Sequence, residues 1–326
     1  MAAITLVEAI NLALARALAD DPNVVVFGED VGVNGGVFRA TVGLQQRFGP
    51  ARVFDTPLAE ALIAGMAVGL AVEGLRPVAE IQFAGFAYTT IDQLLNEAGR
   101  MRHRTLGRLS CPLLLRTPCG AGIRAPEHHS ESPEAMFAHI PGIRVVYPTS
   151  PRRAYGLLLA AIRDPDPVVF LEPSRLYRRE KEEVEDDGQA LPLDTCFLLR
   201  AGTDVTLVTW GACVAETLQA AEQLAAEGIA AEVIDVATLK PIDFDTIVAS
   251  VAKTGRCVIV TEAPRTCSLA SEISAEVSER ALLSLLGPVQ RVTGWDTPTP
   301  MARLEHLYIP SPQRICAAVR NAMAYA

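Results

Sequence analysis

The sequence predicts an α/β fold with two α/β domains, each built on a mostly parallel β-sheet. The chain has 326 residues, more than one ordinary hydrophobic core holds, so two domains are expected. Short β-branched runs alternate with helical patterns in both halves, which is typical of parallel sheets covered by helices. A charged stretch at 178–189 interrupts this alternation. We therefore expect domains at 1–177 and 201–326, joined by an exposed linker over 178–200.

The first half predicts helices and strands in alternation. A helix from Thr5 to about Leu18 begins with the Thr-x-x-Glu pattern of a capping box. The β-branched run at 24–28 ends in glycine and has the character of a buried parallel strand. The small-residue run at 61–71 is apolar on nearly every side, which predicts a helix buried in a core. Further strands are expected at 77–81, 113–116, 144–147 and 168–171, with a helix at about 153–163.

The second half repeats the pattern on a smaller scale. Strands are expected at 205–211, 231–235 and 257–262, with a helix from about 214 to 227. These elements predict the second, smaller α/β domain.

The composition excludes several classes of protein. Half of the residues are hydrophobic (50%) and 21% are charged, as in a globular protein. The net charge of −9 argues against a nucleic-acid partner. The 7 cysteines form no C-x-x-C pair, so neither a zinc site nor a disulfide framework is expected. The N-terminus has no signal-peptide pattern and no apolar run is long enough to span a bilayer, which predicts a cytoplasmic chain with no membrane partner.

A glycine-rich loop at 32–36 does not predict a nucleotide site. It matches neither G-x-G-x-x-G nor a Walker A sequence. The missing glycine motif after the strand at 24–28 also argues against a nicotinamide-dependent dehydrogenase, the alternative that α/β alternation alone suggests.

Glu60 is the first candidate functional residue. It ends the segment Asp-Thr-Pro-Leu-Ala-Glu at 55–60, immediately before the apolar helix. A carboxylate there is costly to desolvate unless it has a partner. The alternative is a plain helix start, with Asp55 or Thr56 as the cap and Glu60 in the first turn.

Two further segments carry candidate chemistry. Gln82 and Phe86 follow the strand at 77–81, where the aromatic ring is either core or a face for a planar ligand. His128 and His129 lie in a loop rich in Gly, Pro and Ser, where catalytic groups are common but structural histidines also occur. No Cys or Asp cluster accompanies them, so a zinc site is not expected.

These segments resemble the β subunit of the E1 component of 2-oxoacid dehydrogenase complexes, which use thiamine diphosphate (ThDP). The resemblance is carried by D-T-P-x-x-E at 55–60, by E-x5-F-x4-I-D-Q at 80–93 and by H-S-x-S at 129–132. The second half resembles the transketolase C-terminal domain, most specifically at 235–241. The resemblance therefore implies a transketolase-like pyrimidine-binding domain followed by a transketolase C-terminal domain.

The resemblance also implies roles for individual residues. Glu60 would exchange a proton with N1′ of the aminopyrimidine, which a partly protonated buried carboxyl can do. Leu58, Gln82 and Phe86 would bind the same ring. His129, which Ser130 follows directly, would donate a proton during reductive acylation of the lipoyl group.

Two details qualify the histidine assignment. Glu131 stands where the family often has Gln, and we expect it to raise the pKa of His129 if the two are close. His128 is expected only to line the channel that leads to the cofactor.

Cofactor and partner predictions follow from what the chain lacks. It has no G-D-G segment for the Mg²⁺ and diphosphate of ThDP, so the resemblance implies an E1 α subunit that holds them in an α2β2 heterotetramer. An E2 acyltransferase with its lipoyl domain is the second expected partner. A structural potassium ion is implied near the turn at 161–168, and its candidate ligands are Asp164, Ala161, Asp166 and Leu113.

The implied reaction is oxidative decarboxylation of a 2-oxo acid and transfer of the acyl group to lipoyl lysine. Pyruvate is the favoured substrate. A branched-chain 2-oxo acid comes second, because the segments at 132–135 and 170–177 also resemble branched-chain enzymes. An acetoin dehydrogenase β subunit and a non-catalytic E2-docking subunit are the remaining alternatives. The docking subunit predicts loss of Glu60 or His129, and both are present.

Overall fold

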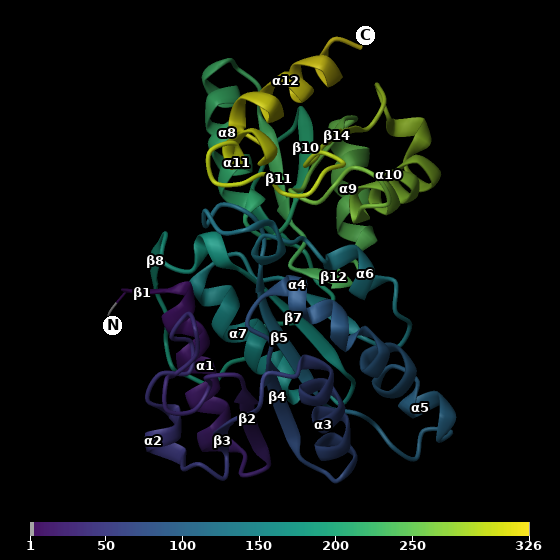
Figure 1. The fold of residues 1–326 in the computed structure, drawn as a ribbon. Helices are drawn as coiled ribbons and strands as arrows, with labels where there is room; N and C mark the ends of the chain where they lie inside the picture. Colours follow the sequence, from purple (N-terminus) through teal and green to yellow (C-terminus); the bar gives the residue numbers. More distant parts are fainter. Residues whose placement is uncertain (1–2, 326) are drawn as a thin grey trace. The chain divides into compact units, whose positions relative to one another are not determined.

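The computed structural model describes residues 3–325, which form two compact units (Figure 1). The first unit takes the described residues up to Cys119 together with Met136–Leu193. The second unit takes Gly120–Ala135 and the described residues from Asp194 onward. The segment 120–135, which carries both candidate histidines, therefore belongs to the second unit although it interrupts the first in sequence. The domain limits predicted above remain predictions.

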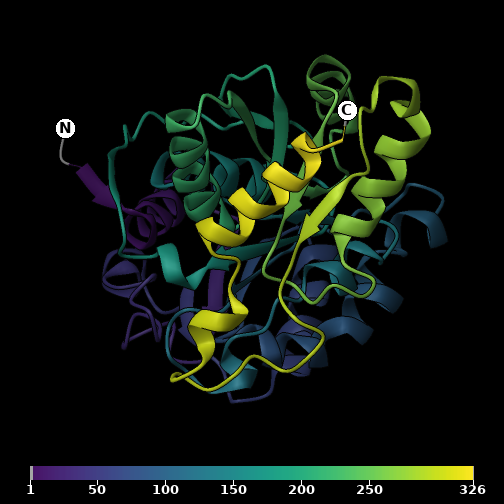
Figure 2. The same ribbon diagram turned by 90° about the horizontal axis from the view of Figure 1, so that it is seen from above.

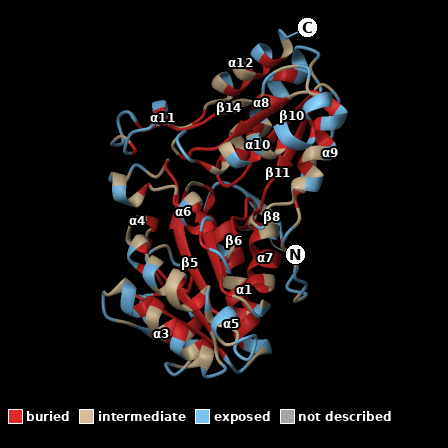
Figure 3. Ribbon diagram, turned by 90° about the vertical axis from the view of Figure 1, so that its right-hand side faces the viewer, coloured by how far each residue is buried: buried red, intermediate tan, exposed pale blue. Residues whose placement is uncertain are grey.

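The first unit is built on a parallel sheet with the strand order β6-β7-β5-β4-β2-β3. Its strands are covered on both faces, as parallel sheets usually are, and strands β5 and β6 are buried in Figure 3. The strands are β2 (Val24–Gly28), β3 (Val53–Asp55), β4 (Arg76–Glu80), β5 (Leu114–Cys119), β6 (Arg144–Val146) and β7 (Val168–Pro173). The predicted parallel sheet is thus confirmed.

The helices of the first unit include the one predicted at the N-terminus, α1 (Leu6–Asp20). Its capping box is present, because the carboxylate of Glu8 accepts hydrogen bonds of 2.7 Å from both the N–H and the hydroxyl of Thr5. Helix α1 packs against α7 (Pro151–Arg163). The other helical segments are α2 (Leu44–Phe48), α3 (Glu60–Val72), α4 (Ala84–Ala87), η1 (Tyr88–Thr90), η2 (Gln93–Ala98), α5 (Met101–Arg104) and η4 (Ser174–Leu176), and α6 (Glu134–Ala138) lies at the unit boundary.

Helix α3 differs from its prediction in one respect. The helix is present, but it is not buried on all sides. Ile63 and Ala67 are fully buried, whereas Leu62 is 55% exposed and Leu58, just before the helix, is 80% exposed. A helix that is apolar on all sides is expected to be buried, but its sequence does not indicate whether the same chain or another chain buries it. Within this unit α3 keeps an open apolar face.

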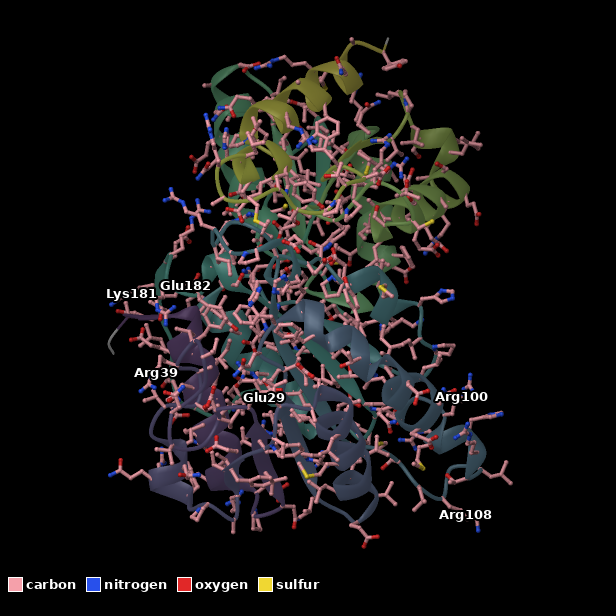
Figure 4. All side chains as sticks on the ribbon, in the orientation of Figure 1. Glu29, Arg39, Arg100, Arg108, Lys181 and Glu182 are labelled. Carbon is pink, nitrogen blue, oxygen red and sulfur yellow. The ribbon has the colours of Figure 1, made fainter. Side chains whose placement is uncertain are left out.

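The charged stretch after 178 is largely exposed, as predicted, but it is not a free connection. Strand β8 (Lys181–Glu183) pairs antiparallel with β1 (Ala3–Thr5) at the edge labelled by Lys181 and Glu182 in Figure 4. Further along, the Leu191 N–H donates to the Gly156 carbonyl at 3.0 Å. Short strands of this kind carry little local signal, so the sequence alone did not reveal the pairing.

The second unit contains a sheet with the order β14-β13-β10-β11-β9, in which only the β9–β11 pair is antiparallel among the described residues. Its strands are β9 (Phe197–Arg200), β10 (Val205–Thr209), β11 (Ala231–Asp235), β13 (Cys257–Val260) and β14 (Gln290–Val292), with the short β12 (Thr238–Lys240). Its helices are η3 (Glu127–His129), α8 (Cys213–Ala226), α9 (Phe244–Thr254), α10 (Leu269–Arg280), η5 (Leu282–Ser284), α11 (Glu305–Tyr308) and α12 (Pro312–Met323). Figure 2 shows α12, in yellow, running beside this sheet.

Within residues 3–325, none of the helices combines the length and the apolar character that crossing a bilayer requires.

Candidate functional site

Three neighbouring strands of the first unit end at one edge of the sheet. The parallel register places Gly28 at the end of β2 opposite both Asp55 on β3 and Glu80 on β4. The segments that leave this edge carry Glu29, Glu60 and Gln82. Ligands of open α/β sheets bind outside the carboxyl ends of the strands, so the candidate residues lie where a site is expected.

The loops at this edge are held by backbone contacts that need a glycine. Gly28 has φ +155°, and an added Cβ would lie 2.5 Å from the carbonyl oxygen of Glu80. The Gly28 carbonyl accepts from the Thr56 N–H at 3.0 Å, and the Asp55 carboxylate accepts from the Gly32 N–H at 2.6 Å. Asp55 therefore joins two loops and does not cap α3, whose N-cap residue, Ala59, makes no side-chain cap bond.

Glu60 is the first residue of α3 and is half-buried, beside a second carboxylate that the sequence analysis missed. Glu29, labelled in Figure 4, is buried, with 6% of its surface exposed. Burial and, to a smaller extent, the charge of Glu60 raise the pKa of Glu29. A hydrogen bond from the Ala59 N–H acts in the opposite direction and lowers it. The buried Oε1 of Glu29 has no hydrogen-bond partner among the described residues. The signal for Glu29 was its position directly after a buried strand.

Gln82 and Phe86 line the next segment. The side-chain amide of Gln82 donates to the Asp30 carboxylate at 3.2 Å, which ties this segment to the Glu29 loop. The ring of Phe86 meets Phe83 edge-on at 6.3 Å, and both rings are half-buried. Leu58 is exposed at the entry of α3. The arrangement offers a carboxyl pair, an amide and an aromatic surface at one edge.

A buried charged cluster joins strands β4, β5 and β7 of the same sheet. The guanidinium of Arg116 on β5 donates to both oxygens of Glu172 on β7, at 2.6 and 2.7 Å, and also to Glu80 at the end of β4. The Tyr177 hydroxyl donates to Glu172 as well. Arg116 is 1% exposed. This cluster cross-links three strands at the ends from which the site segments emerge, and the sequence analysis missed it because its members are far apart along the chain.

The candidate histidines belong to η3 of the second unit. Their ring centroids are 4.2 Å apart. Burial, and after it the charge of His128, lower the pKa of His129, while Glu127 acts in the opposite direction. The net shift of the His129 pKa is thus downward, because desolvation of the imidazolium dominates, and the effect expected of Glu131 stays a prediction.

The histidine segment is anchored by other parts of the second unit. The buried carboxylate of Glu305 on α11 accepts from the Gly122 N–H at 2.6 Å and from the Arg124 N–H at 3.2 Å. The Thr299 hydroxyl donates to the Ser130 carbonyl at 3.2 Å. These long-range contacts had no sequence signal, and they position the loop that carries His129.

We expect Glu305→Ala to lower the stability of the chain by about 1.5–3 kcal/mol, because two backbone donors lose a charged acceptor. Urea unfolding followed by circular dichroism measures the change. Glu272→Ala, on the exposed side of α10, is the matched control and is expected to stay within about 0.5 kcal/mol of wild type. Equal effects of the two variants would show that Glu305 does not anchor the loop.

The candidate potassium ligands already have partners. The Asp164 carboxylate pairs with Arg144 at 3.0 Å and accepts from the Asp166 N–H at 2.8 Å. The Leu113 carbonyl accepts from the Val168 N–H at 2.9 Å, and Ala161 provides the carbonyl for the Asp164 N–H. Among the described residues, no group of three or more His, Cys, Asp or Glu side chains is arranged to hold a metal. The potassium site stays a prediction.

Comparison with known proteins bears on this geometry. Residues 2–180 match the family model "Transketolase, pyrimidine binding domain", and residues 195–315 match "Transketolase, C-terminal domain". The chain is 50% identical to the pyruvate dehydrogenase E1 component subunit beta of Acholeplasma laidlawii over 98% of each chain. It is 48% identical to the subunit of that name from Bacillus subtilis over 100% of each chain. The chain belongs to the pyruvate dehydrogenase E1 β-subunit family.

Membership of the E1 β-subunit family confirms the resemblance and the fold predicted from the sequence. A solved structure described as "Split gene transketolase, inactive beta4 tetramer" is similar, with a TM-score of 0.82, 26% identity and coverage of 99% of both chains. The motif residues of the E1 β family thus lie on a transketolase-type frame, with Glu60 in the pyrimidine-binding part.

Proposed function

We propose that this chain is the β subunit of a ThDP-dependent E1 enzyme that oxidatively decarboxylates pyruvate and acylates E2-bound lipoyl groups. The observation that carries the proposal is the place of Glu60, the first residue of α3, beside the buried Glu29. The chain that carries it is 48–50% identical in sequence to two pyruvate dehydrogenase E1 β subunits. The enzyme is an oxidoreductase acting on 2-oxo acids, and its second subunit supplies the rest of the site.

The residues at the sheet edge fit the aminopyrimidine of ThDP. The ring offers nitrogen donors and acceptors and a flat apolar face, and the edge offers carboxyls, the Gln82 amide and the Phe86 ring. When bound, ThDP supplies the electron sink that stabilises the carbanion left by decarboxylation. Glu60 would hold or release a proton at N1′. Glu29, whose pKa is raised, would keep a second proton close to Glu60. Leu58 would cover the ring from the entry of α3.

His129 is proposed to donate a proton to a lipoyl sulfur during acyl transfer. Since burial and His128 lower its pKa, a step that requires the imidazolium slows as the pH rises through this lowered pKa. The lowered pKa also makes the proton easier to release once it is in place.

We expect His128→Gln to raise the pKa of His129, because the substitution removes the neighbouring positive charge that lowers it. The measurement is the rate of lipoyl acylation against pH in the assembled enzyme, whose falling limb should move to higher pH. Decarboxylation assayed with an artificial electron acceptor should keep its wild-type profile. An unshifted limb would contradict the proposed role of His129.

Three finer proposals concern ions and partners. The Mg²⁺ that binds the ThDP diphosphate would be held by the E1 α subunit of an α2β2 heterotetramer. The E2 acyltransferase and its lipoyl domain would be the acyl acceptor. A potassium ion at Asp164 would have to compete with the guanidinium of Arg144 for the carboxylate, so retention of stability when K⁺ is replaced by Na⁺ would dismiss the site.

The substrate is tested by co-expressing the chain with its α subunit and assaying with ThDP and Mg²⁺. Pyruvate is the expected substrate, and omission of ThDP should abolish turnover. Faster turnover of 3-methyl-2-oxobutanoate would assign a branched-chain enzyme, and acetoin cleavage would assign an acetoin dehydrogenase. No turnover of any substrate in an assembled tetramer would favour the docking subunit.

A further inference from the structure

The second unit contains a basic pocket that no step of the proposed reaction uses. Its cavity, of about 390 Å³, lies where β14 and the loop after it meet α12. Three guanidinium groups and two side-chain amides line this basic pocket, from Arg265, Arg291, Arg314, Gln290 and Asn321. Trp295, 56% exposed, contributes an aromatic ring.

The three arginines have no carboxylate at ion-pair distance among residues 3–325. This is unusual in a chain with 38 acidic and 29 basic residues. Burial, and after it the charge of Arg265, lower the pKa of Arg291, so two of the cations repel each other. Burial also lowers the pKa of Arg314. A bound anion would offset both the desolvation of the two guanidinium groups and the repulsion between Arg265 and Arg291.

One acid, Asp296, lines the pocket, and the hydrogen bonds from Thr266 and, after them, the charge of Arg265 lower the pKa of its carboxyl. The Asp296 carboxylate accepts from the N–H and the hydroxyl of Thr266, at 2.9 and 2.8 Å. The pocket lining therefore carries one negative charge and three positive charges, so its net charge is positive.

The guanidinium groups are held in place before any ligand arrives. Arg314 donates to the carbonyls of Thr293 at 2.5 Å and Tyr308 at 3.3 Å, and its central carbon lies 4.8 Å from the Trp295 ring centroid. Arg265 donates to the Arg291 carbonyl at 3.2 Å, and Arg291 donates to the Ser271 hydroxyl at 2.5 Å. Each guanidinium has five N–H donors, so donors remain for a ligand, and little side-chain entropy is left to lose.

We propose that the basic pocket binds a small anionic metabolite, whose phosphate or carboxylate oxygens are held by Arg265, Arg291 and Arg314. Planar arginine forks match such oxygen pairs, and the Trp295 ring provides a flat surface for an attached apolar group. The volume, about 390 Å³, lies in the range of small-molecule sites. The proposal is independent of the reaction assigned above.

The test uses the assembled enzyme saturated with ThDP and Mg²⁺, which keeps the added anions from the cofactor site. Inorganic phosphate, adenosine 5′-monophosphate and tricarballylate are titrated by isothermal calorimetry, and the three arms separate phosphate from carboxylate recognition. We expect saturable binding that weakens with salt, and a loss of about tenfold or more in affinity in Arg291→Gln. Arg280→Gln, on an exposed arginine that pairs with Asp245, should bind as wild type does.

A second readout needs no arginine variant. Trp295 lines the pocket, so anion binding should change the tryptophan fluorescence of the assembled enzyme, and Trp295→Phe should abolish the change. Absence of binding in the wild-type enzyme would overturn the proposal. So would equal losses in Arg291→Gln and Arg280→Gln. A failure of pyruvate turnover would leave these titrations interpretable, so the two proposals fail separately.

Discussion

Replacing Glu60 with Gln is expected to lower kcat for pyruvate by about 10²–10⁴-fold, the range that a positioned acid or base contributes. The amide keeps the size of the side chain and cannot exchange a proton with N1′. The KM for pyruvate should change little, because Glu60 is assigned to the cofactor and not to the substrate. The measurement is steady-state decarboxylation by the co-expressed enzyme with saturating ThDP and Mg²⁺.

Glu73→Gln is the matched control for this variant. Glu73 is the C-cap residue of the same helix and is exposed, so its amide should leave kcat unchanged. ThDP affinity is measured for both variants by the quenching of intrinsic fluorescence, which separates lost chemistry from lost binding. Full activity of Glu60→Gln would contradict the proposed proton exchange at N1′ and remove Glu60 from the mechanism.

Replacing Arg116 with Met is expected to cost about 3–5 kcal/mol of unfolding free energy, the cost of removing one partner of a buried ion pair. The change leaves the carboxylates of Glu80 and Glu172 inside the sheet without a counter-charge. Urea unfolding at neutral pH measures it. Arg108→Met, at the exposed periphery labelled in Figure 4, should stay within about 0.5 kcal/mol.

The loss in Arg116→Met should depend on pH. Burial raises the pKa of Glu80 and Arg116 opposes that rise, so the variant raises it further. A group with a folded-state pKa above its unfolded value stabilises the fold at low pH and ceases to do so as the pH rises through the folded pKa. The variant should therefore lose less stability at pH 5 than at pH 7. The reverse order would contradict the assigned charge on the cluster.

Local patterns predicted much of the fold. The Thr5–Glu8 capping box, the β-branched strands and the apolar helix after Glu60 are each indicated by residues within a few positions of each other. The Glu60 motif was short enough to recognise, and the structure places it at the edge where β2, β3 and β4 end.

Contacts between distant residues were not predicted. The Arg116 cluster joins side chains on separate strands, and Glu305 reaches back about 180 positions to the histidine loop, at sequence separations of 183 and 181. No local pattern encodes such pairs. The lowered pKa of His129 was not predicted either, because the burial of a loop side chain depends on the surrounding fold.

The open apolar face of α3 also limits when the enzyme can act. Glu60 begins the helix whose Leu62 is 55% exposed in the single chain, so the single chain leaves the start of this helix open to solvent. Chemistry of this kind gains its strength in a water-excluded environment. An orphan subunit should therefore be inert and prone to degradation, and mass action would couple both its lifetime and its activity to the supply of the α subunit. Assembly would then prevent reaction in unassembled subunits, because only the complete enzyme would exclude water from the site.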